Sequence, residues 1–103
     1  MTLADFQRAA ARTINPALSE RDRFLDAASG LAEEAGEVLG LVRKHLMQGR
    51  NLEPDRVAEE LGDALLCLTI TAQCAGLTLD QVAAANIAKL SGRHPDGFTP
   101  APR

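Results

Sequence analysis

Residues 31–41 read LAEEAGEVLGL, and residues 57–66 read VAEELGDALL. In both stretches leucine, valine and alanine recur at three- and four-residue spacing, which predicts two amphipathic α-helices. Each stretch also carries two acids three residues apart, with glycine directly before the second acid. These acids are Glu34 and Glu37, then Glu60 and Asp63. Because side chains three residues apart share one face of a helix, each predicted helix presents a pair of carboxylates on one side.

The composition indicates an all-α protein. Of the 103 residues, 46% are apolar, but only three are aromatic and all three are phenylalanine. Alanine and leucine dominate, and the β-branched residues do not alternate, so helix is favoured over sheet throughout the chain. The length gives room for one domain, which we expect to span residues 1–103.

The charge and hydropathy pattern argue against two classes of partner. A net charge of -3 gives no general attraction to nucleic acid or to an anionic membrane. We find no basic and then apolar leader at the start, and no stretch with the length and apolarity of a membrane span. We therefore expect a cytoplasmic protein that binds neither a nucleic acid polymer nor a membrane. Cys67 and Cys74 lie about 10 Å apart along one predicted helix, so we expect two reduced thiols in the core.

Start and stop signals predict four helices. Thr2 is a suitable N-cap for a helix over residues 2–13, and Asn15-Pro16 ends it. A second helix is expected from Phe24 to Gln48, before Gly49. Pro54 suits the first position of a third helix, which runs to about residues 75–76. Thr78 and Gln81 form a capping box for a fourth helix to about Leu90, followed by an extended tail that contains Arg93.

The predicted helices carry signs of close packing. Along the second helix an apolar stripe is expected at Leu31, Ala35, Val38, Leu39, Val42 and Leu46. Gly36 and Gly40 each cost about 1 kcal/mol relative to alanine inside a helix, so we infer that a second helix or a ligand approaches there. Residues 64–72 are apolar almost all round, which suggests burial on more than one face and a subunit interface. We expect an antiparallel helical bundle of four helices per chain, completed by oligomerisation as a homodimer or homotetramer.

The two acid pairs predict a divalent-metal site. A short loop makes the second and third helices antiparallel, and counting the rise from the loop places the pairs within about two turns of each other. Four carboxylates at close range repel one another unless a cation neutralises them, and ligands that are all oxygen suit Mg²⁺ or Mn²⁺. The competing interpretation is a solvated acidic surface balanced by Arg and Lys. Two pairs of equal spacing at the border of the apolar stripe favour the metal site.

These residues resemble the MazG-like all-α nucleoside triphosphate pyrophosphohydrolases. That family carries EExxE followed, after a helix-loop-helix, by ExxD, here Glu33-Glu34-Ala-Gly-Glu37 and Glu60-Leu-Gly-Asp63. Asn86-x-x-Lys89 and Arg93-x-Pro95-x-Gly97 also look like its C-terminal pattern, so the resemblance covers residues 24–98. It implies a hydrolase that cleaves a nucleoside or deoxynucleoside triphosphate between the α and β phosphates, giving the monophosphate and pyrophosphate, with Mg²⁺ or Mn²⁺.

The resemblance also implies roles for single residues. Glu34, Glu37, Glu60 and Asp63 look like the metal ligands, and Glu33 would orient or deprotonate the attacking water. Asn86, Lys89 and Arg93 look like substrate-binding residues. The alternative for Lys89 and Arg93 is that they complement a helix C-terminus, and Asn86 is then a surface residue. Neither His45 nor His94 is assigned to metal.

The absence of Trp and Tyr leaves base selectivity open. Phe24 or Phe98 would have to stack a base, although we expect Phe24 in the core. Two other functions remain in view. One is phosphoribosyl-ATP pyrophosphohydrolase, which has a similar acidic motif and which residues 76–82 would suit. The other is a non-catalytic helical oligomer that binds metal or nucleotide, or an antitoxin-like partner of another protein.

Overall fold

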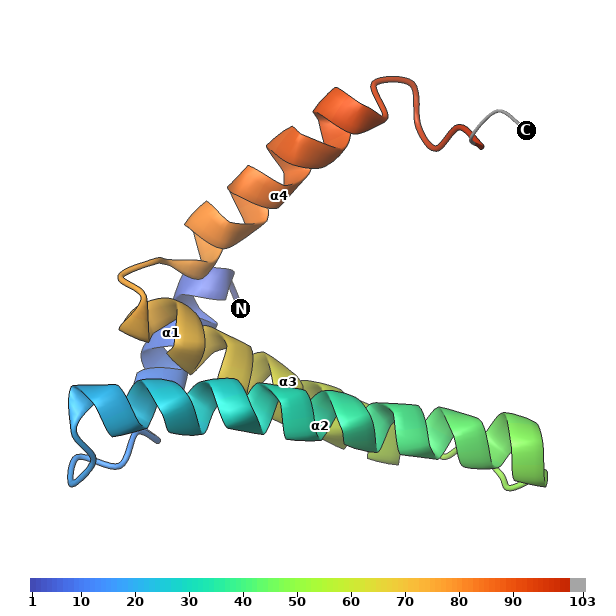
Figure 1. Cartoon of the computed structure of the whole chain (residues 1–103), viewed down its shortest axis with the longest axis horizontal. Helices are drawn as coiled ribbons and strands as arrows, with labels where there is room; N and C mark the ends of the chain where they lie inside the picture. The colour runs from blue at the N-terminus through green and yellow to red at the C-terminus, as the bar shows by residue number, and fades with distance from the viewer. Residues whose placement is uncertain (101–103) are drawn as a thin grey trace.

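The computed structural model describes residues 1–100 and contains four α-helices, which confirms the all-α prediction. The helices are α1 (Leu3–Ala11), α2 (Glu20–Gln48), α3 (Pro54–Cys74) and α4 (Leu79–Arg93). The long helices α2 and α3 lie side by side and antiparallel, α1 packs at the far end of this pair, and α4 leaves it as an arm (Figure 1). Among residues 1–100 no single helix has the length and apolarity to cross a bilayer; α3 and α4 meet that criterion only jointly, and they are bent by 97°.

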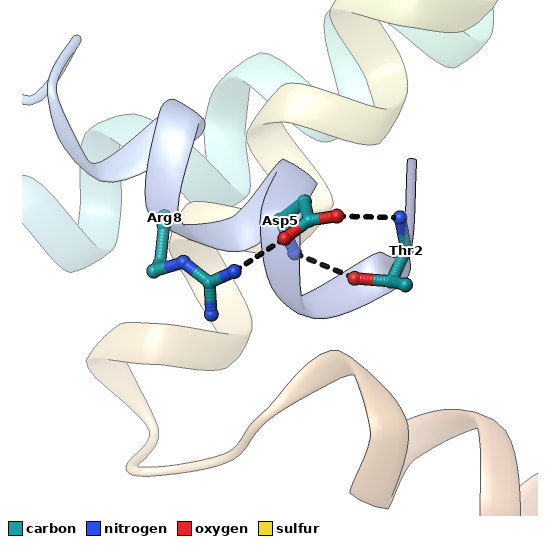
Figure 2. A network of polar contacts seen from close by, with 3 residues as sticks. All are labelled: Thr2, Asp5 and Arg8. Atoms are coloured by element: carbon teal, nitrogen blue, oxygen red, sulfur yellow. Dashed lines mark hydrogen bonds and ion pairs between the residues drawn. The ribbon is translucent and has the colours of Figure 1, made fainter.

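Local signals in the sequence place most of the helix ends. Thr2 caps α1: its hydroxyl accepts a hydrogen bond from the Asp5 amide, and its amide donates one to the Asp5 carboxylate, both at 3.0 Å. Arg8 pairs with the same carboxylate one turn further on (Figure 2). Thr78 and Gln81 form the predicted capping box of α4. At the starts of α1 and α4 the threonine side chain thus accepts a hydrogen bond from a backbone amide of the first turn, as the capping motif requires.

Two helix ends differ most from the prediction. The helix α2 begins at Glu20 rather than at Phe24, because the Ser19 hydroxyl accepts a hydrogen bond from the Asp22 amide at 3.1 Å and caps it. The polar residues that we expected to precede the helix form its first turn, where acidic side chains complement the dipole. At the other end of the chain α4 continues through Gly92 to Arg93, so Arg93 belongs to the helix and not to the tail.

The side chains buried on α2 and α3 are small. Ala27 of α2 and Ala72 of α3 are buried, and Thr69 is fully enclosed at 0% exposure. The Thr69 hydroxyl donates a 2.6 Å hydrogen bond to the Leu65 carbonyl in the same helix, so its burial leaves no unsatisfied group. Small residues let the two helix backbones approach closely, which fixes the relative height of side chains on the two helices.

The close approach lies at Gly30, not at Gly36 or Gly40. A Cβ atom at Gly30 would lie 2.8 Å from the Sγ atom of Cys67 in α3, whereas at Gly36 or Gly40 no described atom beyond the adjoining residues and backbone of α2 itself lies within 4 Å of such a position. As an inference about packing within the chain, the sequence prediction was therefore wrong in position. An approach to Gly36 or Gly40 by a ligand or a second copy stays a prediction.

The arm α4 is held by a glutamine from α1. The Gln7 side chain donates to the Leu77 carbonyl at 3.3 Å and accepts from the Leu79 amide at 3.0 Å. Leu79 is buried, and its amide is one of the first in α4, where a helix offers no internal partner. Gln7 thus links α1 to the start of α4. The arm leaves the rest of the chain at this end of α4 (Figure 1).

Much of the predicted apolar stripe on α2 is exposed. Leu31 and Val38 are half-buried, as are Leu41 and His45 on the same face. Leu39 and Leu46 are instead 65% and 71% exposed. The helix therefore has two apolar faces, and α3 covers one of them. Phe24, expected in the core, is 41% exposed near the start of α2.

Candidate metal centre

Three of the predicted acids meet across the α2–α3 pair. Glu34 and Glu37 come from α2 and Glu60 from α3, and one carboxylate oxygen from each lies within 4.8 Å of the other two. The antiparallel pairing brings them level, because the short connection over residues 49–53 fixes how far each lies from the turn. Glu34 and Glu60 are half-buried between the helices, and Glu37 is exposed at the rim.

The cluster has polar atoms that the chain itself does not satisfy. The Oε2 atoms of Glu34 and Glu60 are both buried and have no hydrogen-bond partner. A buried carboxylate oxygen without a partner is costly, and such atoms are few in native proteins. A hard divalent cation between these oxygens would supply the missing interaction and neutralise the charge. The donor set therefore fits Mg²⁺ or Mn²⁺.

The close approach of the carboxylates in the cluster also changes a pKa. The pKa of Glu37 is raised above its ordinary value of 4.5, first by a hydrogen bond with Glu60 and then by the negative charge of Glu60. Desolvation and the charge of Asp63 raise it further, and Arg56 opposes them. Without a cation, part of the repulsion is thus relieved when Glu37 binds a proton.

Asp63 and Glu33 lie beside the cluster rather than within it. Asp63 is one turn after Glu60, exposed, and outside the group of three, although its charge acts on Glu37. Glu33 is exposed on α2 next to Glu34. The pKa of the Cys67 thiol is raised, first by burial and then by nearby acids that include Glu33, Glu34 and Asp63. Both acids therefore border the same region of the helix pair.

The three predicted substrate-binding residues lie elsewhere in the chain. Asn86, Lys89 and Arg93 are all on α4, which leaves the end of α3 at 97°. Glu60 is fourteen residues from the end of α3, about 21 Å along the axis, and Lys89 is about 15 Å further along the arm. These two axial distances, joined at this angle, place Lys89 roughly 25 Å from Glu60. Within one chain these residues and the acidic cluster do not form one site.

Sequence reasoning missed one cation, Arg56, whose charge acts on the cluster. Arg56 precedes Glu60 by four residues on α3, and its positive charge lowers the pKa of Glu37. The signal was present, since residues four apart share a helix face, but the sequence analysis did not consider Arg56. The two histidines have other partners: His45 donates to the Arg50 carbonyl at 2.6 Å, and the His94 ring lies 5.8 Å from that of Phe98.

Comparison with known proteins agrees with this geometry. The family model of the MazG nucleotide pyrophosphohydrolase domain matches residues 24–98, which contain all the acids of the cluster. Neither the curated proteins nor the solved structures include a significant match to this chain. The matched region covers well over half of the chain. The chain therefore belongs to the MazG nucleotide pyrophosphohydrolase domain family.

Proposed function

We propose that the protein hydrolyses nucleoside or deoxynucleoside triphosphates between the α and β phosphates, using Mg²⁺ or Mn²⁺. The observation that carries this proposal is the pair of buried, unpartnered carboxylate oxygens of Glu34 and Glu60, which face each other across a MazG-family helix pair. Glu37 completes the cluster from the rim, and Asp63 is one turn away. Together these four acids are the proposed metal ligands.

Addition of the water oxygen at either the β- or the α-phosphorus would give these products, and we propose addition at the α-phosphorus. The bond between that phosphorus and the bridging oxygen breaks, and pyrophosphate leaves with the oxygen and its electron pair. When bound, the divalent ion would neutralise phosphate charge and lower the pKa of a coordinated water. Glu33 is exposed on α2 four residues before Glu37, so the two share a helix face at the rim of the cluster. We assign it the role of orienting or deprotonating that water.

The exposed face of α2 supports assembly with a second copy. Its apolar residues are spaced alternately three and four apart, as in helix-helix interfaces: Leu25, Ala28, Ala32, Ala35, Leu39, Val42 and Leu46. All seven are exposed in the single chain. A second apolar surface lies in the corner between α3 and α4, where a groove of about 340 Å³ is lined by residues that include Leu65, Leu68 and Val82. We infer a homodimer, with a tetramer as the next larger assembly, in which these surfaces are covered.

Such an assembly would also complete the site. Lys89 and Arg93 lie far from the acids of their own chain, but the arm that carries them projects freely (Figure 1). Opposite charges favour pairing these cations with an acidic cluster that holds phosphate and metal. We therefore propose that Asn86, Lys89 and Arg93 reach the substrate bound to a second copy.

Mixing two inactive variants tests this arrangement. A chain with Glu37→Gln retains its arm, and a chain with Lys89→Ala retains its acids. If the site is shared between copies, each mixed dimer regains one intact site, formed by the acids of one chain and the arm of the other. Random subunit exchange should therefore restore about a quarter of the activity. No recovery after verified exchange would place Lys89 outside the partner's site.

The activity itself is tested with a panel of ordinary and modified NTPs and dNTPs. We expect monophosphate and pyrophosphate in the presence of Mg²⁺ or Mn²⁺, resolved by ion-exchange chromatography and abolished by EDTA. Phosphoribosyl-ATP belongs in the same panel, since preferential turnover of it would assign the chain to histidine biosynthesis instead. Metal or nucleotide binding without turnover of any substrate would indicate a binding protein.

A further inference from the structure

A cationic pocket lies at the turn between α2 and α3, outside the acidic cluster. Its volume is about 460 Å³, and its lining includes Lys44 of α2, Arg50 and Glu53 of the connection, and Arg56 of α3. Three cations thus face one carboxylate. Within residues 1–100 none of these cations forms an ion pair, since the ion pairs found there join Arg8 to Asp5 and Arg21 to Asp22. The pocket carries positive charge that the described chain leaves unpaired.

The backbone of this pocket is fixed by the end of α2. Gly49 adopts a left-handed conformation, with φ of 66°, and reverses the chain. The Arg50 amide then donates to the Lys44 carbonyl at 3.2 Å, and the Arg50 carbonyl accepts from His45 Nδ1 at 2.6 Å. Both polar groups of the Arg50 backbone are therefore tied to the last turns of the helix. A pocket arranged in advance loses less entropy when it takes up a ligand.

The pocket lies next to the acidic cluster along the α2–α3 pair. Leu41, in its lining, is one helical turn beyond Glu37, and Arg56 is one turn before Glu60. One turn is about 5.4 Å along the axis, so the nearest lining residues lie about one turn from the acids, toward the connection. A chain of phosphates that starts at the cluster and runs toward the turn would meet Arg56 and then Lys44 and Arg50.

Phosphate groups are the ligand that this lining fits. Guanidinium groups bind phosphate through two parallel hydrogen bonds, and lysine adds a point charge. We propose that this pocket is a phosphate subsite, which holds the terminal phosphates of the substrate and then the pyrophosphate that leaves. This inference rests on the proposed function for its ligand. It directs the triphosphate toward the α2–α3 turn and the nucleoside away from it.

Binding of inorganic pyrophosphate to the metal-free protein tests the subsite without relying on hydrolysis. The full chain in EDTA is titrated with pyrophosphate by calorimetry, alongside the variants Lys44→Gln and Arg50→Gln. We expect each variant to bind about tenfold more weakly, the scale of one charge-assisted contact. The matched control is Arg43→Gln, which removes the same charge from the neighbouring position on α2 and does not line the pocket. Circular dichroism verifies that all variants are folded.

Equal losses in Arg43→Gln and Lys44→Gln would overturn the subsite, because a general charge effect would then suffice. Absence of pyrophosphate binding by the folded wild-type chain would overturn it as well. A nucleoside triphosphate analogue with a non-hydrolysable α–β bridge tells whether the pocket binds the terminal phosphates of the substrate or only free pyrophosphate. The same tenfold loss of affinity for the analogue in Lys44→Gln and Arg50→Gln places the terminal phosphates in the pocket. A loss of affinity for pyrophosphate alone refutes the binding of the substrate's terminal phosphates there. Specific pyrophosphate binding by a protein that hydrolyses no substrate would support the pocket and refute the proposed function.

Discussion

The Cβ position of Gly30 lies 2.8 Å from the Sγ atom of Cys67, which makes this the tightest glycine contact between α2 and α3 within residues 1–100. A side chain at residue 30 would displace the thiol. The contact lies one turn from Glu34, so it fixes how the two halves of the acidic cluster approach each other.

A double-mutant cycle measures this contact. Alanine is favoured over glycine in a helix by about 1 kcal/mol, so Gly30→Ala should stabilise a Cys67→Ala background by that amount. In the wild-type background the clash with Sγ should remove the gain, giving a coupling of about 0.5–3 kcal/mol. Denaturant unfolding of the four proteins gives the cycle. Additive effects would mean that the thiol and residue 30 do not compete for space.

Gln7→Ala should loosen the arm. The variant loses the two hydrogen bonds to Leu77 and Leu79, each worth about 1 kcal/mol, and leaves a buried amide without a partner. We expect a loss of roughly 1–3 kcal/mol in the free energy of unfolding and faster hydrogen exchange at the Leu79 amide. The control is Gln48→Ala at the exposed end of α2, which should leave both quantities nearly unchanged. Unaltered Leu79 exchange in Gln7→Ala would show that other contacts hold α4.

The raised pKa of Glu37 predicts how the metal-free protein responds to pH. Because the folded-state pKa lies above the ordinary value of 4.5, the stability contributed by this group is full below pH 4.5 and is lost as pH rises through the folded-state pKa. In EDTA, the Tm of the wild type should therefore fall relative to the Tm of Glu37→Gln as pH rises from 4 to 8. Mg²⁺ should raise the wild-type Tm most at the upper end of this range.

Other groups titrate over the same range, so the comparison with the variant is essential. Asp5, for example, has a lowered pKa because its carboxylate accepts a hydrogen bond from the Thr2 amide. Its contribution to the stability of the fold is therefore lost as pH falls. Subtracting the Glu37→Gln curve removes such contributions. A difference curve that is flat across this range would contradict the repulsion between Glu37 and Glu60.

The exposed stripe on α2 predicts how assembly can be disrupted. Leu39→Glu places a charge at the middle of the stripe and should convert a dimer to a monomer, because burying an unpaired carboxylate is costly. Gln48→Glu, which adds the same charge at the end of the helix, should leave the dimer intact. Light scattering across a wide concentration range provides the measurement. A wild-type monomer at all concentrations, or a dimer in Leu39→Glu, would refute this interface.

The features that were predictable from the sequence depend on local chemistry. Thr2 and Thr78 begin helices through hydrogen bonds with residues one turn away, and Pro54 begins one because its fixed φ suits the first helical position. The three-residue spacing of the acids gives their helix face directly. The facing of Glu34 and Glu60 also followed, because a short connection allows only an antiparallel pair.

The features that were missed depend on partners distant in sequence. Gly30 is special only because Cys67 lies opposite, and the direction of α4 depends on Gln7, seventy residues or more from its two partners. Arg56 became significant only once the fold placed it next to Glu37. The Ser19 cap was a local signal that we overlooked inside a polar stretch.

The measurement that tests the central claim most directly compares Glu37→Gln with Glu59→Gln in a triphosphate hydrolysis assay. Both variants remove one acid, but Glu59 lies outside the three-carboxylate cluster. With Mg²⁺ present, we expect monophosphate and pyrophosphate from the wild type and from Glu59→Gln, and a loss of at least about a hundredfold in Glu37→Gln. Undiminished hydrolysis by a folded Glu37→Gln protein would contradict the proposal that this cluster is the catalytic metal centre.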